Sequence, residues 1–307
     1  MKTEKIYQGN CIEVLKDFPD GSVDCVVTSP PYWGLRDYGV GEQLGLEETP
    51  EEFVSNLVKV FSEVKRVLKS SGTVWLNLGD SYSQSGDLGI GGSDKQRSNK
   101  GSNLVKRYNN SKLKPKNLVG IPWRVAFALQ ADGWYLRQDI IWHKPNPMPE
   151  SVQDRCTKSH EYIFLLTKSP KYFYDPDAIK EKSVDKESYS GRRKRVLNNK
   201  YQQTTGHLNT TGVPEGKTYE MRNKRSVWTI TTKPYKEAHF ATYPIELPTY
   251  CIKAGCPEGG IVLDPFFGSG TTGLAAQEQS RRWVGIELNP EYIEIAKRRL
   301  SQQTLFV

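Results

Sequence analysis

Two short segments of the chain have residue types and spacings that suit the binding of a ligand. The first, Ser29-Pro30-Pro31-Tyr32, follows an apolar run at 24–28 and precedes Trp33. Prolines fix φ and carry no amide hydrogen, so the backbone leaves the expected strand rigidly and offers the carbonyls of Ser29 and Pro30 as acceptors. Together with the Ser29 hydroxyl and the two aromatic rings, they suit a planar group that carries an exocyclic amine. The structural alternative is a proline-terminated strand with aromatic residues in the core.

The second segment, residues 261–273, reads as a strand, a glycine turn and a helix start, and it matches G-x-G-x-x-G. Glycines let the backbone approach a ligand closely, and amides at a helix N-terminus point into the turn. Glu287 lies nineteen residues after Gly268, where a carboxylate can bind ribose hydroxyls. Only 34 residues follow Gly273, too few to complete a dinucleotide-binding sheet, and Leu274 stands where a P-loop requires Lys. A tight turn without a ligand is the structural alternative.

The elements around these segments predict an α/β fold, because short apolar runs alternate with helix-like stretches. We expect a mostly parallel sheet with helices on both faces and seven strands, at 5–7, 24–28, 72–78, 136–143, 161–167, 261–264 and 283–287. Helical spacing predicts helices at 50–69, 122–131, 244–254, 271–279 and 290–300. Both chemical segments would then follow strands, at the edge where open sheets bind ligands.

Positive charge is concentrated in two segments, although the whole chain of 307 residues carries only +8. Residues 95–116 hold eight basic residues and no acid, residues 180–236 carry +9, and the remaining chain is therefore negative. This segregation favours DNA-facing elements, with Lys106 and Arg107 in the first and Arg192, Arg193, Lys194 and Arg195 in the second. Solvated loops are the alternative.

Several other classes of protein are excluded or disfavoured by the composition. No run approaches the ~20 apolar residues that a membrane-spanning helix needs, and the N-terminus lacks an apolar signal core. The five cysteines form no C-x-x-C, which suits reduced thiols in a cytosol, so we expect a cytoplasmic protein. The four histidines lack close ligand spacing, and we expect no metal site.

With both segments considered together, the chain resembles the amino-group DNA methyltransferases that use S-adenosylmethionine. The tetrapeptide at 29–32 comes first, a basic region follows and the loop at 264–272 comes last, which is similar to the permuted β group of that family. The likeness covers nearly the whole chain and implies a circularly permuted Rossmann-like fold. It also implies double-stranded DNA as substrate and, in a bacterium or phage, a restriction endonuclease for the same site as a candidate partner.

The resemblance divides the chain into parts. It implies a catalytic half at 1–80, a basic insertion at 81–117, a core continuation at 118–179, a target-recognition region at 180–236 and a cofactor-binding part at 237–307. The permuted order also predicts that the strands near Tyr7 and Glu287 lie side by side. The tetrapeptide and the glycine loop would then follow neighbouring central strands.

The resemblance also assigns roles to residues. The catalytic ones are Ser29, Pro30, Pro31 and Tyr32, and we add Trp33 as a DNA contact. The cofactor's adenine is assigned to Asn10 and Cys11, its ribose to Glu287, and its methionine part to a segment that includes Phe240. The other implied cofactor contacts are Asp264, Phe266, Gly268, Ser269, Gly270, Thr271 and Thr272.

In this interpretation the target base rotates out of the duplex, and its amine donates to the Ser29 hydroxyl and the Pro30 carbonyl while Tyr32 stacks on the ring. In the family, Ser at the first position mostly accompanies N4-cytosine methylation and Asp mostly N6-adenine methylation. Methylation at cytosine C5 requires a Cys that follows a Pro, and no Cys of this chain does so. The sequence strings of the zinc deaminases are also absent. N6-adenine methylation and an inactive DNA-binding relative are the alternatives. A third, methylation of a protein glutamine, resembles enzymes with Asn at the first position, from which Ser29 departs.

Overall fold

The computed structural model describes the chain apart from residues 36, 84–112, 184–219, 233–241 and 304–307. Its elements follow in this order: β1 (Lys5–Gln8), α1 (Cys11–Lys16), β2 (Val23–Thr28), α2 (Pro50–Val67), β3 (Leu68–Leu78), α4 (Ile121–Ala131), β4 (Tyr135–His143), β5 (His160–Thr167), a 3-10 helix η1 (Asp177–Ile179), β6 (Glu181–Lys182), β7 (Met221–Arg222), β8 (Val227–Thr229), α6 (Glu246–Gly255), β9 (Ile261–Asp264), α7 (Thr271–Glu278), β10 (Arg282–Glu287) and α8 (Pro290–Gln303).

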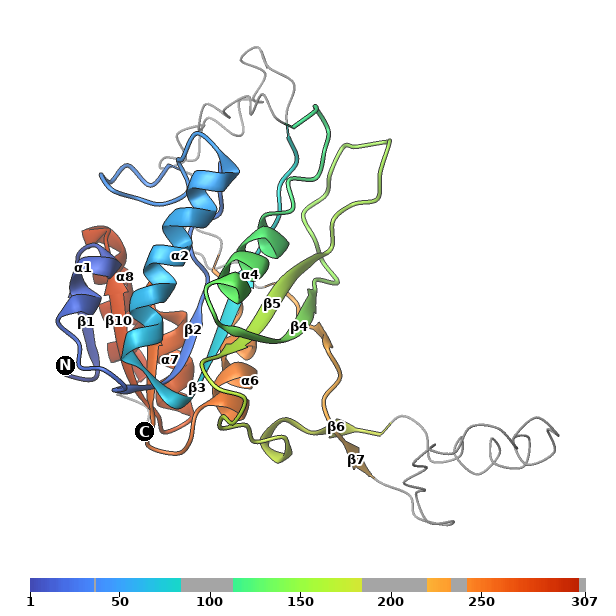
Figure 1. The fold of residues 1–307 in the computed structure, drawn as a ribbon. Helices are drawn as coiled ribbons and strands as arrows, with labels where there is room; N and C mark the ends of the chain where they lie inside the picture. The colour runs from blue at the N-terminus through green and yellow to red at the C-terminus, as the bar shows by residue number, and fades with distance from the viewer. Residues whose placement is uncertain (36, 84–112, 184–219, 233–241, 304–307) are drawn as a thin grey trace, which may run out of the picture. The chain divides into compact units, whose positions relative to one another are not determined.

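The central sheet of the described chain has eight strands in the order β1-β10-β9-β2-β3-β5-β4-β8 (Figure 1). β5 runs antiparallel to both of its neighbours, and the other neighbouring pairs are parallel. The carboxyl ends of β1, β10, β9, β2, β3 and β4 therefore meet at one edge, where β5 begins. This edge, called here the carboxyl edge, is where an open α/β sheet binds ligands.

Helices cover both faces of the sheet (Figure 1). α1, α2 and α4 lie along one face, and α6 and α7 lie along the other. The pleat of β3 shows the division, because successive side chains point to opposite faces. Val74 and Leu76 join the core under α2, whereas the Thr73 hydroxyl donates to the Gly255 carbonyl of α6 over 2.9 Å.

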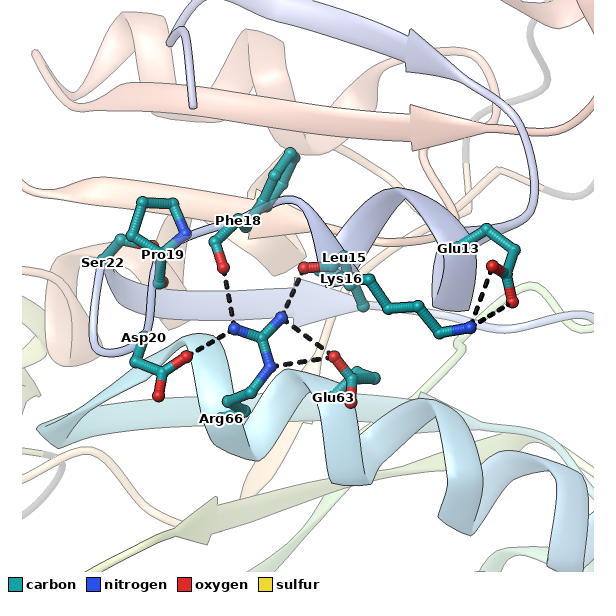
Figure 2. A network of polar contacts seen from close by, with 9 residues as sticks. All are labelled: Glu13, Leu15, Lys16, Phe18, Pro19, Asp20, Ser22, Glu63 and Arg66. Atoms are coloured by element: carbon teal, nitrogen blue, oxygen red, sulfur yellow. Dashed lines mark hydrogen bonds and ion pairs between the residues drawn. The ribbon is translucent and has the colours of Figure 1, made fainter.

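α2 is the main helix of the first face and has clear sequence signals at both ends. The Thr49 hydroxyl accepts a hydrogen bond from the Glu52 amide, and Pro50 occupies the first turn, where its missing amide hydrogen costs nothing. At the other end, Arg66 donates to the carbonyls of Leu15, in the last turn of α1, and Phe18, just after α1, at 2.6 and 2.8 Å (Figure 2). α2 thereby holds the short helix α1 in place.

The described residues form two compact units, 1–175 with 226–307, and 176–225. The first contains the whole eight-stranded sheet. In the second, the two-stranded sheet of β6 and β7 is antiparallel, and Glu181 pairs with Arg222 and Arg225. This unit overlaps the expected target-recognition region at 180–236, which stays a prediction, and the residues of β8 belong to the main sheet.

The fold confirms the expected Rossmann-like, mostly parallel architecture. All seven expected strands are present, and the eighth, β8, was missed because only three residues pair at the sheet edge. α1 was also missed, and α2 ends two residues earlier than expected because β3 begins at Leu68. The predicted neighbours pair as expected, with Gln8 opposite Glu287 and Val26 opposite Leu263. Among the described helices, none is long and apolar enough to cross a membrane.

Candidate cofactor and catalytic site

The glycine loop after β9 combines one open position with one packed position. Gly268 and Gly270 have φ values of +50° and +81°, in the left-handed region that favours glycine. A Cβ at Gly268 would meet no neighbour closer than the Phe266 carbonyl at 4.0 Å. At Gly270 it would lie 3.0 Å from the Ala296 Cβ of α8. Gly268 therefore leaves space for a ligand, whereas Gly270 lets α7 and α8 pack closely.

Asp264, at the end of β9, ties three elements together and is buried. One oxygen accepts from the Thr28 hydroxyl at 2.6 Å and the Phe266 amide at 3.0 Å, and the other accepts from the Thr272 hydroxyl at 2.5 Å. Burial raises the pKa of this carboxyl group, while these donors oppose the shift. Asp264 and Thr272 therefore hold the start of α7 against the end of β2.

Arg299 of α8 is a residue of this site that the sequence analysis missed. Its guanidinium donates to the Ser269 carbonyl at 2.8 Å, the Ser269 hydroxyl at 2.6 Å and the Thr271 hydroxyl at 3.1 Å. These hydroxyls hold the loop in its conformation, and their predicted contact with the cofactor stays a prediction. No local pattern indicates Arg299, because it lies 28 residues after Thr271.

Glu287 ends β10 beside this loop with its carboxylate held by backbone donors. One oxygen accepts from the Gly268 amide at 2.7 Å and the other from the Asn289 amide at 2.8 Å. Burial raises its pKa, and the two backbone bonds oppose the shift. Each carboxylate oxygen keeps a further lone pair, so Glu287 can still accept hydrogen bonds from two hydroxyl groups.

Asn10 and Cys11 lie next to Glu287, because β1 pairs with β10 and the Gly9 amide donates to the Glu287 carbonyl at 3.0 Å. The Asn10 side chain accepts from the Ile12 amide and so caps α1. Burial raises the pKa of the Cys11 thiol to about 12, so it is protonated at neutral pH and is no nucleophile.

The tetrapeptide begins directly after β2, at the carboxyl edge. Pro30 is buried, Ser29 and Tyr32 are half-buried, and the Ser29 hydroxyl lies 3.4 Å from the Tyr32 oxygen. Gly79, after β3, leaves room for the tyrosine ring, because a Cβ there would lie 2.5 Å from Cε2 of Tyr32. Among the described residues, none donates a hydrogen bond to the Pro30 carbonyl, and its role as an acceptor for the substrate amine stays a prediction.

A polar network that the sequence analysis missed holds the Tyr32 hydroxyl. It donates to Glu161 at 2.7 Å and lies 3.2 Å from the Asn77 side-chain oxygen. The same carboxylate oxygen of Glu161 accepts a hydrogen bond from the Asn77 side-chain NH2 group at 3.1 Å. The other carboxylate oxygen of Glu161 forms an ion pair with Lys144. Burial and the Glu161 charge raise the pKa of Tyr32 well above its ordinary value, so its hydroxyl keeps its proton.

Trp33 was predicted as a DNA contact, and the structure places it in the core instead. Its side chain is 9% exposed, and its indole nitrogen donates to the Glu47 carbonyl at 2.9 Å. The large apolar ring is buried under the loop that follows the tetrapeptide, so the structural alternative was correct for this residue.

Several predicted residues lie outside the described part of the chain: Phe240, Lys106, Arg107, Arg192, Arg193, Lys194 and Arg195. The segment predicted near the cofactor's methionine part is described only from residue 242. There the Tyr243 hydroxyl contacts Thr272 and lies 3.3 Å from Asp264, so this segment reaches the end of β9.

Comparison with known proteins decides the family. A family model described as DNA methylase, of the N6/N4 type, matches residues 23–298. The chain belongs to the N6/N4 DNA methylase family. The type II methyltransferase M.Cfr9I of Citrobacter freundii is 50% identical over 96% of this chain and 87% of its own.

Two solved structures resemble the fold of this DNA methylase. The PvuII DNA methyltransferase, titled cytosine-N4-specific, matches with a TM-score of 0.66 at 19% identity, over 97% of this chain and 86% of its own. A putative DNA modification methylase of Thermus thermophilus, in complex with S-adenosyl-L-methionine, matches with a TM-score of 0.58 at 25% identity, over 97% and 93%.

The cofactor of this DNA methylase is S-adenosylmethionine, and the site has the groups that it needs. Gly268 leaves open space beside the loop amides, and each Glu287 oxygen keeps an acceptor position, which fits a cofactor with two ribose hydroxyls. The cofactor contacts assigned to Glu287, Asn10, Cys11 and Phe240 stay predictions.

Proposed function

We propose that this DNA methyltransferase transfers the methyl group of S-adenosylmethionine to the exocyclic N4 amine of a cytosine in double-stranded DNA. One observation carries the proposal. β2 and β9 are paired, parallel neighbours, so the tetrapeptide and the glycine loop leave the same edge of the sheet side by side. A base held by the first segment would then meet a methyl donor held by the second.

The tetrapeptide is proposed to hold the flipped base and to prepare its amine. An exocyclic amine is a poor nucleophile, because its lone pair is delocalised into the ring. If its two hydrogens are donated to the Ser29 hydroxyl and the Pro30 carbonyl, the nitrogen becomes pyramidal and its lone pair becomes available. S-adenosylmethionine supplies a methyl group that is already activated by the sulfonium charge. The chain's contribution is therefore alignment and charge placement, without a covalent enzyme intermediate.

Tyr32 is proposed to stack on the base, and the polar network sets the plane of its ring. Unstacking a base costs a few kcal/mol, and stacking on an aromatic side chain returns about 1–3 kcal/mol. The full stacking free energy is gained only if the Tyr32 ring is already in position. Glu161 and Asn77 hold the hydroxyl end, while Gly79 makes room beside the ring.

The choice of cytosine rests on Ser29, because the family resemblance associates Ser at this position with N4-cytosine. The name of the PvuII enzyme agrees, although at 19% identity that likeness supports only the fold. N6-adenine is the second candidate, since both bases carry the same kind of amine. An inactive relative is disfavoured because Ser29, Gly268 and Glu287, to which the proposal assigns roles, are all present.

We further propose that the basic segments at 81–117 and 180–236 bind the DNA and that some of their side chains determine the target sequence. Their charge is the support, because phosphate contacts need Lys and Arg. A restriction endonuclease for the same site is a proposed partner, supported by the type II name of M.Cfr9I.

Nucleoside analysis tests the proposed reaction. The purified protein is incubated with unmethylated DNA and methyl-labelled S-adenosylmethionine, and the digested nucleosides are separated by chromatography and identified by mass spectrometry. We expect label in N4-methylcytosine and far less of it in the same time with Tyr32→Ala. Label in N6-methyladenine would contradict the base assignment, and the absence of label from DNA would contradict the proposed function.

A further inference from the structure

The loop at 144–159 joins β4 to β5 and rises from the carboxyl edge (Figure 1). β4 is parallel to β2 and lies three strands away in the sheet. Neighbouring strands are about 4.8 Å apart, so the start of the loop is roughly 14 Å across the sheet from the tetrapeptide. This separation is smaller than the width of a DNA duplex, so one bound duplex can meet both.

Contacts on several sides hold this loop in place. Near its start, the Asn146 side chain donates to the Thr232 carbonyl at 3.0 Å and accepts from the Thr232 amide at 3.1 Å. Near its end, Arg155 pairs with Glu150 at 2.6 Å and lies 4.0 Å from the ring centre of Tyr82. These contacts therefore fix the loop on both sides of Met148.

The first half of this loop carries an exposed apolar side chain between two prolines. Met148 is 87% exposed, more than any other large hydrophobic residue of the described chain, where Val227 follows at 58%. Pro147 and Pro149 flank it, and they restrict the backbone on both sides of Met148. Methionine is unbranched and polarisable, so it can enter a narrow apolar gap.

We propose that Met148 inserts into the DNA base stack and fills the gap that the flipped target base leaves. This inference rests on the proposed function. A flipped base leaves its neighbours unstacked, and apolar side chains, Met and Pro among them, are known to insert between base steps. Met148 is then a residue that stabilises the open duplex and takes no part in the methyl transfer itself.

The test compares two duplexes that carry the target site, mapped beforehand by sequencing methylated DNA. In one, the target base is fully paired, and in the other it faces an abasic site, so that flipping costs less. Single-turnover methyl transfer is measured for the wild type, Met148→Ala, Met148→Leu and the control Val152→Ala, which truncates a 38% exposed residue of the same loop.

We expect Met148→Ala to slow transfer about tenfold or more on the paired duplex and less than about threefold on the abasic duplex. Only in the paired duplex must the base pair of the target be broken before the base can flip. Met148→Leu should restore the paired rate, and Val152→Ala should match the wild type on both duplexes. Equal losses on the two duplexes, or no loss on the paired one, would overturn the proposal. A wild-type protein that methylates neither duplex would instead overturn the proposed function.

Discussion

Glu161→Gln isolates the role of the network behind Tyr32. The carboxylate accepts hydrogen bonds from the Tyr32 hydroxyl, the Asn77 amide group and Lys144, so every neighbour is a donor. Glutamine has the same shape but only one acceptor oxygen. Whichever way its amide group turns, its NH2 group faces at least one of these donors.

The magnitude follows from the lost contacts. A hydrogen bond to a charged group contributes about 1.5–3 kcal/mol, and the half-buried Lys144 also loses its partner, with 20% of its side chain exposed. We expect the free energy of unfolding to fall by about 2–3 kcal/mol. If the displaced Tyr32 ring raises the activation free energy of methyl transfer by about 1.4 kcal/mol, the rate falls about tenfold.

Three measurements separate these effects: thermal unfolding, calorimetric affinity for S-adenosylmethionine and the single-turnover rate. Glu161→Gln should lower the unfolding temperature and the rate while it leaves the cofactor affinity within about twofold. Tyr32→Phe removes the hydroxyl group that Glu161 holds, so Glu161→Gln should slow transfer no further in that background. Lys144→Met is the matched control, because it removes charge from the network but leaves the bond between Glu161 and Tyr32. If Glu161→Gln loses stability yet transfers methyl groups at the wild-type rate, the positioning role of Glu161 is refuted.

Four further predictions concern other parts of the molecule. Gly270→Val should displace the glycine loop, because a Cβ at this position would lie 3.0 Å from the Ala296 Cβ and the φ of +81° disfavours a side chain. Calorimetry should therefore detect no cofactor binding. Gly79→Ala should slow methyl transfer with unchanged cofactor affinity, because it displaces the Tyr32 ring; an unchanged rate would contradict this. Cofactor affinity should fall on acidification, and the fall should begin above pH 4.5, the ordinary pKa of a glutamate, because burial raises the pKa of Glu287. Only the ionised carboxylate accepts from both ribose hydroxyls, so Glu287→Gln should remove the pH dependence. Arg66→Met should lower the free energy of unfolding by about 1–3 kcal/mol, whereas Lys16→Met, which breaks the exposed pair with Glu13, should change it by less than about 1 kcal/mol (Figure 2).

Much of the fold could be predicted because its signals are local. Apolar runs marked all seven expected strands, and the proline pair after 24–28 and the glycines after 261–264 marked where two of them end. The permuted motif order predicted the pairing of β1 with β10, which places Asn10 near Glu287. Trp33 shows the limit of such signals, since an aromatic residue beside a motif can equally well belong to the core.

The network behind Tyr32 could not be predicted, because it depends on strand direction. An apolar run does not show whether its strand is parallel or antiparallel. β5 runs antiparallel, so its first residues, and not its last, lie at the carboxyl edge. Glu161 therefore reaches Tyr32 from 129 residues away, and no spacing in the sequence indicates that contact.

The central claim is that Ser29 and Tyr32 direct methyl transfer to a cytosine amine, and expression in a bacterial host that lacks DNA methylation tests it most directly. DNA from cells that carry the wild type, Ser29→Ala or Tyr32→Ala is sequenced with a method that distinguishes modified bases. We predict N4-methylcytosine at one recurring site with the wild type and sharply less with either variant at equal protein levels. Unmodified DNA with the wild type, or full methylation with Tyr32→Ala, would contradict the account.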